Sequence, residues 1–189
     1  MAAALVLTSC DDNSDELDAL KKRIKTLESM TGSTEPITFN YSTTDYNDDA
    51  VIKTTSYRFK GSDSQTSRIM DFGDGEYAVS VTRFSNINAD ESAQFYFVYD
   101  TETGDVSDTE VYIDFYHFAG YSFNSNFHQN DTESEFTITV NSFNAETGMI
   151  DVAIHAATTE NSGYNYYEGN PQTIDLAFKG KLGFYSMPN

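Results

Sequence analysis

Apolar and polar residues alternate along the chain from residue 37 to its C-terminal end. Successive side chains of a β-strand point to opposite faces, so an apolar residue at every second position is typical of a strand with one buried face. The pattern recurs in segments at 37–41, 51–59, 77–81, 95–99, 111–115, 136–140, 150–154 and 174–178. With the turn signals between them, these segments predict a β domain over 37–189 that contains about nine or ten short strands.

The turns favour antiparallel hairpins. Two related loops, at 100–104 and 144–148, each follow a predicted strand and end in a glycine. Glycine is expected there because hairpin loops of four or five residues need a positive φ. We therefore predict an all-β fold, an antiparallel β-sandwich, with a lipocalin-like closed barrel as the alternative. No helical pattern interrupts the strands, which excludes the doubly wound nucleotide-binding folds.

Two of the predicted strands, at 95–99 and 112–118, are apolar on both faces. One interpretation is a central strand with one face in the core and the other covered by a loop or a neighbour. The other is a solvent-facing row of Tyr and Phe that serves as a binding platform, since exposed apolar patches usually have a function.

Before the β domain, residues 15–31 predict a short helix, and residues 32–36 predict a hinge. Arg23 and Glu28 fit a pattern of short parallel trimeric coiled coils, in which the arginine reaches a glutamate of a neighbouring chain. The sequence thus predicts a homotrimer, with an isologous dimer as the competing assembly. The alternative to self-association is a helix that packs on its own domain or stays frayed. The apolar residues of the helix have coiled-coil spacing: Leu17, Leu20, Ile24 and Leu27.

The first ten residues are small and apolar and end in Leu7-Thr8-Ser9-Cys10. This tetrad resembles the lipobox of bacterial lipoproteins. The acidic run that follows, at 11–16, resembles the export signal that directs Bacteroidota lipoproteins to the outer face of the outer membrane; a solvated spacer is the alternative. The resemblance implies a lipid on Cys10, a truncated signal peptide at 1–9, an acidic tether at 10–14 and a lipid-anchored protein exposed at the cell surface.

Composition narrows the classes of partner. Thirty acidic and 11 basic residues give a net charge of −19, which repels nucleic acid. All 13 Tyr and 14 Phe lie after residue 35, in the predicted β domain. The single cysteine excludes a disulfide framework within the chain. Membrane attachment would rest on acyl chains, because no segment approaches the roughly 20 apolar residues of a transmembrane helix.

Candidate chemistry is sparse. No nucleophile elbow, zinc-protease motif, P-loop or C-x-x-C is present, so we expect no enzyme activity and no cofactor. His117, His128 and His155 lie far apart and lack metal-ligand spacing, so no metal is expected. His117 and His155 fall in alternating strands, where a rim or outer-face position is the expected one.

One long loop, at 159–171, is the candidate binding segment, since loops of this length are often functional. Its Tyr164, Tyr166 and Tyr167 stand beside Asn and Glu. Such side chains offer flat apolar faces and polar edges to a glycan, and also suit a protein ligand. The alternative is that these tyrosines fold back over the edge of the sheet.

The sequence therefore favours a non-catalytic surface lipoprotein whose β-sandwich has a binding or structural role. A glycan-binding accessory protein of a polysaccharide-uptake system is the second hypothesis. A hydrolase with an unrecognised carboxylate pair is the third.

Overall fold

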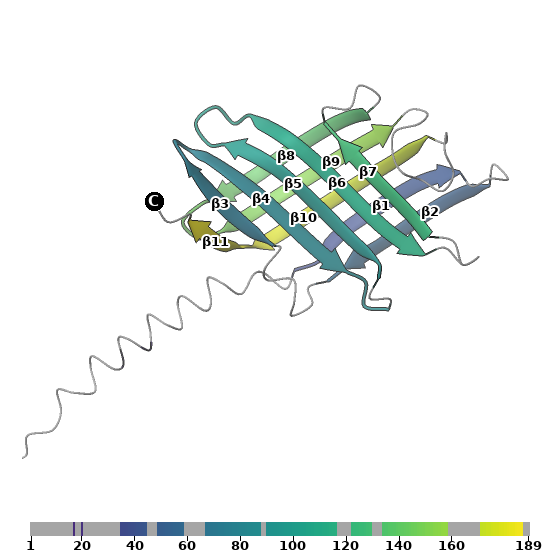
Figure 1. The fold of residues 1–189 in the computed structure, drawn as a ribbon, viewed down its shortest axis with the longest axis horizontal. Helices are drawn as coiled ribbons and strands as arrows, with labels where there is room; N and C mark the ends of the chain where they lie inside the picture. The colour runs from purple at the N-terminus through teal and green to yellow at the C-terminus, as the bar shows by residue number, and fades with distance from the viewer. Residues whose placement is uncertain are drawn as a thin grey trace, which may run out of the picture.

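A computed structural model describes residues 17, 20, 35–44, 49–58, 67–87, 90–116, 122–129, 134–158 and 171–186. Two β-sheets lie face to face, and their strands cross (Figure 1). The five-stranded sheet consists, in spatial order, of β2 (Ala50–Tyr57), β1 (Ile37–Thr44), β10 (Gln172–Lys181), β9 (Met149–Thr158) and β8 (Ser134–Asn144). The six-stranded sheet consists of β11 (Gly183–Ser186), β3 (Arg68–Gly73), β4 (Glu76–Phe84), β5 (Ser92–Asp100), β6 (Val106–Tyr116) and β7 (Ser122–His128).

This architecture confirms the predicted β-sandwich. Neighbouring strands pair antiparallel throughout the described sheets, except that β11 runs parallel to β3. The closed-barrel alternative is wrong, because β2 and β8 are the edges of one sheet and β11 and β7 the edges of the other. The described chain contains 11 strands, slightly more than the nine or ten predicted.

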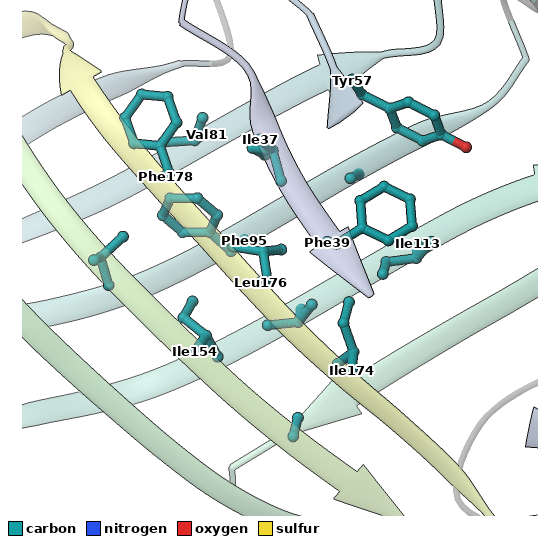
Figure 2. Packing of buried hydrophobic residues seen from close by; sticks show 14 of the residues in the cluster. Ile37, Phe39, Tyr57, Val81, Phe95, Ile113, Ile154, Ile174, Leu176 and Phe178 are labelled. Atoms are coloured by element: carbon teal, nitrogen blue, oxygen red, sulfur yellow. The ribbon is translucent and has the colours of Figure 1, made fainter. Parts of the chain in front are cut away.

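The core lies between the sheets and is formed by the apolar half of each alternating pattern (Figure 2). Phe39, Leu176 and Phe178 of the five-stranded sheet face Val81 and Phe95 of the other, and all are buried. The rings of Phe95 and Phe178 meet across the interface with centroids 5.9 Å apart. Burying each such side chain contributes about 1.5–3 kcal/mol, so the alternation alone accounts for the pairing of the sheets.

The two segments that are apolar on both faces are central strands, as the first interpretation predicted for their place in the sheet, but the tyrosines on their outer face are partly exposed. β5 lies between β4 and β6, and β6 lies between β5 and β7. Phe95 and Ile113 point into the core, whereas Tyr96 and Tyr112 lie half-buried on the opposite face. The outward face of these strands therefore carries tyrosines as well.

One charged side chain, Arg83 at the end of β4, is completely buried in the core. Its Nε donates a hydrogen bond of 2.8 Å to the carbonyl oxygen of Glu35, and its Nη1 donates to Ser67 Oγ and to the Thr82 carbonyl oxygen, both at 2.7 Å. The guanidinium also lies 5.2 Å from the ring centroid of Phe178. Arg83 thus ties the residues that precede β1 to the six-stranded sheet.

The two related hairpin loops have the predicted glycine conformation. Gly104 has a φ of 79° and Gly148 a φ of 72°. Their surroundings differ, since no atom lies within 4 Å of a Cβ built on Gly104, whereas a Cβ on Gly148 would overlap the carbonyl oxygen of Leu182. Leu182 N donates a hydrogen bond of 2.9 Å to the Gly148 carbonyl oxygen, so the loop packs directly on the connection between β10 and β11.

Of the predicted helix at 15–31, the structure describes Leu17 and Leu20, both helical and exposed by 53% and 55%. The remaining seam residues, Arg23 and Glu28 of the trimer pattern, and Cys10 lie outside the described residues, so the assembly and the anchor stay predictions. The described part of the chain contains no helix that is both long and apolar enough to traverse a bilayer.

Candidate functional site

The tyrosines of the 159–171 loop, Tyr164, Tyr166 and Tyr167, lie outside the described residues, so their role stays a prediction. The structure does describe the two ends of this segment. Thr158 ends β9, and Pro171 directly precedes β10.

A buried polar network fixes the C-terminal end of this loop. The hydroxyl groups of Tyr41 on β1 and Ser125 on β7 lie 3.0 Å apart, and both donate to Oε1 of Gln172, the first residue of β10. Thr43 Oγ1 donates to the Pro171 carbonyl oxygen at 3.0 Å. Because these donors come from both sheets, the chain leaves the loop at a fixed point of the sandwich.

The outward face of β5, β6 and β7 gathers aromatic and hydrogen-bonding side chains. Strand register places Tyr96 opposite Glu110 and Gln94 opposite Tyr112. Their neighbours along each strand are core residues, so these side chains point away from the core. We call this surface the tyrosine face; its residues are Gln94, Tyr96, Glu110, Tyr112, Asn126 and His128.

Glu110 occupies the centre of the tyrosine face. Asn126 Nδ2 donates a hydrogen bond of 3.1 Å to Glu110 Oε1, and His128 Nε2 lies 3.3 Å from the same oxygen. The other amide atom, Asn126 Oδ1, is buried and has no hydrogen-bond partner among the described residues. The face therefore presents a carboxylate that Asn126 holds in place, whereas Asn126 Oδ1 itself lies beneath the surface.

Carboxylates surround Tyr96 on this face. Partial burial, followed by the negative charge of Asp108, raises the pKa of the Tyr96 hydroxyl. Asp108 lies where the register between β5 and β6 shifts, and it has a positive φ of 50°. With Glu110 directly opposite on β6, Tyr96 lies in a locally negative environment.

A second group of carboxylates lies at the end of the sandwich where β5 begins. Burial, followed by the charges of Glu91 and Asp90, raises the pKa of Asp114. A raised pKa is a property of general acids. Glu91, the neighbour of Asp114, is however only 6% exposed and already has partners of its own. The Tyr57 hydroxyl donates a hydrogen bond of 3.1 Å to Glu91 Oε2, and Lys53 Nζ lies 3.9 Å from Glu91 Oε1. This arrangement fits a buried structural network better than a pair of carboxylates that attacks a substrate.

Replacing Asp114 by Asn is expected to stabilise the protein at neutral pH. A carboxyl whose pKa is raised by folding contributes fully to stability below its unfolded value of 3.8, and this contribution is lost as the pH rises through the folded value. Asparagine carries no charge at any of these pH values, so Asp114→Asn does not lose stability as the pH rises. The urea midpoint should therefore rise at pH 7, and the difference from wild type should shrink as the pH falls to the unfolded pKa.

Asp100→Asn is the matched control with the opposite sign. Hydrogen bonds from the backbone N–H groups of Glu102 and Thr103 lower the pKa of Asp100, so its contribution is present above 3.8 and is lost as the pH falls through the lowered value. This variant should be less stable than wild type at pH 7. Equal midpoints for Asp114→Asn and wild type at pH 7 would contradict the prediction for Asp114.

The outward face of the five-stranded sheet differs in composition. No tyrosine or phenylalanine occupies its described outward positions. His155 Nδ1 lies 2.7 Å from Asp175 Oδ1 on this face, which confirms the outer-face prediction for His155; His117 lies outside the described residues. A depression of about 250 Å³ near the start of β1 is lined by residues that include Thr38, Asp151 and Lys179. This face offers ion pairs and small side chains, without a stacking surface.

Within the described ranges, no group of three or more His, Cys, Asp or Glu side chains could hold a metal ion. No family model matches the chain, and no curated protein or solved structure matches it either. Its function is therefore inferred from its own residues.

The tyrosine face was predictable only in part from the sequence. The strands with two apolar faces already contained Tyr96 and Tyr112. Asn126 and His128 were missed because β7 was not predicted. Its apolar residues, Phe123 and Phe127, are four positions apart with Ser125 between them, and this spacing is the signal that was available.

Proposed function

We propose that this protein is a non-catalytic lipoprotein, anchored in the outer membrane and exposed at the cell surface, whose β-sandwich binds a ligand. The observation that carries the binding role is the tyrosine face, where the two central strands place Tyr96 and Tyr112 outward beside Gln94 and Glu110. Partly exposed aromatic residues among hydrogen-bonding groups are typical of recognition surfaces. The lipobox-like tetrad ending at Cys10 supports the anchor.

Two measurements, on a Gln94→Cys variant without and with Cys10→Ala, test the surface location and the lipid anchor. The chain has one cysteine, so a Gln94→Cys variant has a single reactive thiol if Cys10 carries lipid. Expressed behind a complete signal peptide, this variant should react with a membrane-impermeant maleimide on intact cells, because Gln94 is exposed. Adding Cys10→Ala should move the protein from the detergent phase to the aqueous phase of a detergent extraction, or leave it uncleaved.

Val79→Cys is the matched control, since Val79 is completely buried and should stay unlabelled in the folded protein. Labelling of Gln94→Cys only after cell lysis would overturn the surface location. Partitioning of the protein with Cys10 intact into the aqueous phase would overturn the lipid anchor.

The second candidate function is a glycan-binding accessory protein of a polysaccharide-uptake system. The tyrosine face favours it over a purely structural role, because amide and carboxylate groups alternate there with the tyrosine rings. Such a face supplies both apolar stacking surfaces and hydrogen bonds.

We also propose that the helix at 15–31 assembles the protein as a homotrimer, with Ile24 and Leu27 in the seam and Arg23 bonded to Glu28 of a neighbouring chain. The exposed side chains of Leu17 and Leu20 support a helix whose apolar stripe is available to other copies. Anchoring on one membrane raises the effective concentration of those copies.

Light scattering on residues 11–189 at high micromolar concentration should give a mass above the monomer value. Arg23→Ala and Ile24→Asp should each lower that mass, because they remove the interchain bond and a seam residue. A twofold mass would assign the competing dimer. A monomer in wild type and variants alike would overturn self-association and leave the helix as a stalk.

A further inference from the structure

The spacing of the two tyrosines indicates the shape of the ligand. Tyr96 on β5 faces Glu110, and Tyr112 on β6 faces Gln94, so the tyrosines are diagonal neighbours on adjacent strands. Diagonal neighbours in an antiparallel pair lie about 7–8 Å apart. Two aromatic rings at this separation suit a ligand with flat apolar patches on successive units, as the C–H faces of linked sugar rings provide.

The polar groups of the face suit hydroxyl groups. Gln94 is exposed and carries both a donor and acceptors beside Tyr112. The Glu110 side chain is 39% exposed and accepts from Asn126 through Oε1, so its carboxylate keeps acceptor capacity toward a ligand. Sugar hydroxyls both donate and accept, so they can complete this set where an apolar ligand cannot.

Glu110 also argues against a protein partner on this face. The centres of protein interfaces are depleted of charged residues and are built from contiguous apolar anchors. Here the centre is a carboxylate flanked by Tyr96 and His128 in the same cross-strand row, and the polar side chains of Gln94 and Glu110 occupy the diagonal that crosses that of the two tyrosines.

The charges select among glycans. Asp108 and Glu110 both lie close to Tyr96, so a uronate or sulfate group on a sugar stacked there would meet like charge. Arg68 lies in the same row on β3, beyond Ser80, and is about 10 Å from Tyr96 at ordinary strand spacing. The charge that acts on the Tyr96 hydroxyl is that of Asp108, and Glu110 lies directly opposite, so the field at Tyr96 is negative.

We infer that the tyrosine face binds an uncharged glycan, with two sugar rings stacked on Tyr96 and Tyr112 and their hydroxyls bonded by Gln94 and Glu110. The inference rests on the proposed function, because it names the ligand class of the same surface.

The test is an array that carries neutral plant, fungal and bacterial polysaccharides beside polygalacturonate and sulfated polysaccharides, probed with the full chain. At least one neutral polysaccharide should bind, and the charged ones should not. Tyr96→Ala and Tyr112→Ala should each weaken that binding by roughly tenfold, as expected for truncation of an anchoring aromatic residue. Glu110→Gln should admit polygalacturonate, because it removes the central negative charge.

Phe72→Ala is the matched control, since Phe72 is an exposed aromatic residue on β3, outside the tyrosine face, and its loss should leave binding unchanged. Unchanged urea midpoints for all variants show that the fold is intact.

If a charged polysaccharide binds as tightly as the neutral ones, and Tyr96→Ala abolishes that binding, the ligand class is overturned while the face is kept. Neutral binding that survives both tyrosine variants would overturn the face. Binding of no glycan would overturn the inference, and the labelling and extraction experiments would still decide the surface location and anchor.

Discussion

Gly148→Ala is expected to destabilise the sandwich far more than Gly104→Ala, although both glycines end related hairpin loops with a positive φ. An L-residue in this conformation costs about 1–2 kcal/mol at either site. At Gly148 the added methyl group also overlaps the carbonyl oxygen of Leu182, which is backbone and cannot rotate aside. Moving that backbone should cost a further 1–3 kcal/mol or so, as in other overpacked sites.

The measurement is the free energy of unfolding from urea titration of wild type and both variants. Gly104→Ala isolates the conformational cost, because no atom lies within 4 Å of its added Cβ. The excess loss in Gly148→Ala then reports the contact with Leu182, which is followed directly by β11. Equal losses in the two variants would show that the loop moves away from Leu182 without cost.

Arg83→Met should lower the free energy of unfolding by about 2–4 kcal/mol, because three hydrogen bonds of a completely buried side chain would be lost. The Glu35 carbonyl oxygen depends on Arg83 Nε, and Ser67 Oγ and the Thr82 carbonyl oxygen each receive a bond from Nη1. Methionine keeps much of the volume beside Phe178, so the change reports mainly the lost hydrogen bonds.

Arg68→Met is the matched control, since Arg68 is exposed on β3 and its replacement should change stability by less than about 0.5 kcal/mol. Arg83→Lys should also be destabilising, because an ammonium group lacks the planar fork that serves several acceptors at once. If Arg83→Met unfolds at the same urea concentration as wild type, the hydrogen bonds of Arg83 only offset the cost of burying its charge.

Strong alternation made most of the fold predictable from sequence. Segments such as 37–41 and 174–178 bury every second residue, and they became β1 and β10. β7 and β11 were harder, because β7 contains two phenylalanines among polar residues and β11 is four residues long. The parallel pairing of β11 with β3 depends on where the chain returns after β10, which local periodicity does not encode.

Arg83 shows a second limit of the pattern. It continues the inward series of Tyr77, Val79 and Val81 on β4, yet a charged residue in that series indicates a strand end at the rim. Arg83 can be buried because it donates hydrogen bonds to the Glu35 carbonyl oxygen and to Ser67 Oγ. Both residues are distant in sequence and approach Arg83 only in the folded chain.

Of the candidate site, the sequence predicts only that two strands carry tyrosines on their second face. Which side chains surround Tyr96 depends on strand register, and a slip of one residue would turn every side chain to the other face. Asp108, whose charge raises the pKa of the Tyr96 hydroxyl, lies at the irregularity opposite Tyr96 and Val98, and no repeat in the sequence indicates that shift.

The position of β1 determines how the domain bears a mechanical load applied through its N-terminus. β1 is an interior strand, bonded to β2 on one side and to β10 on the other, and Arg83 holds the chain at Glu35 just before it. Tension along β1 is therefore shared in shear by two ladders of hydrogen bonds at once, whereas an edge strand would peel away one bond at a time. Under the lipid anchor that we propose, drag away from the membrane would load the sandwich through both of these ladders, so β1 would resist extraction.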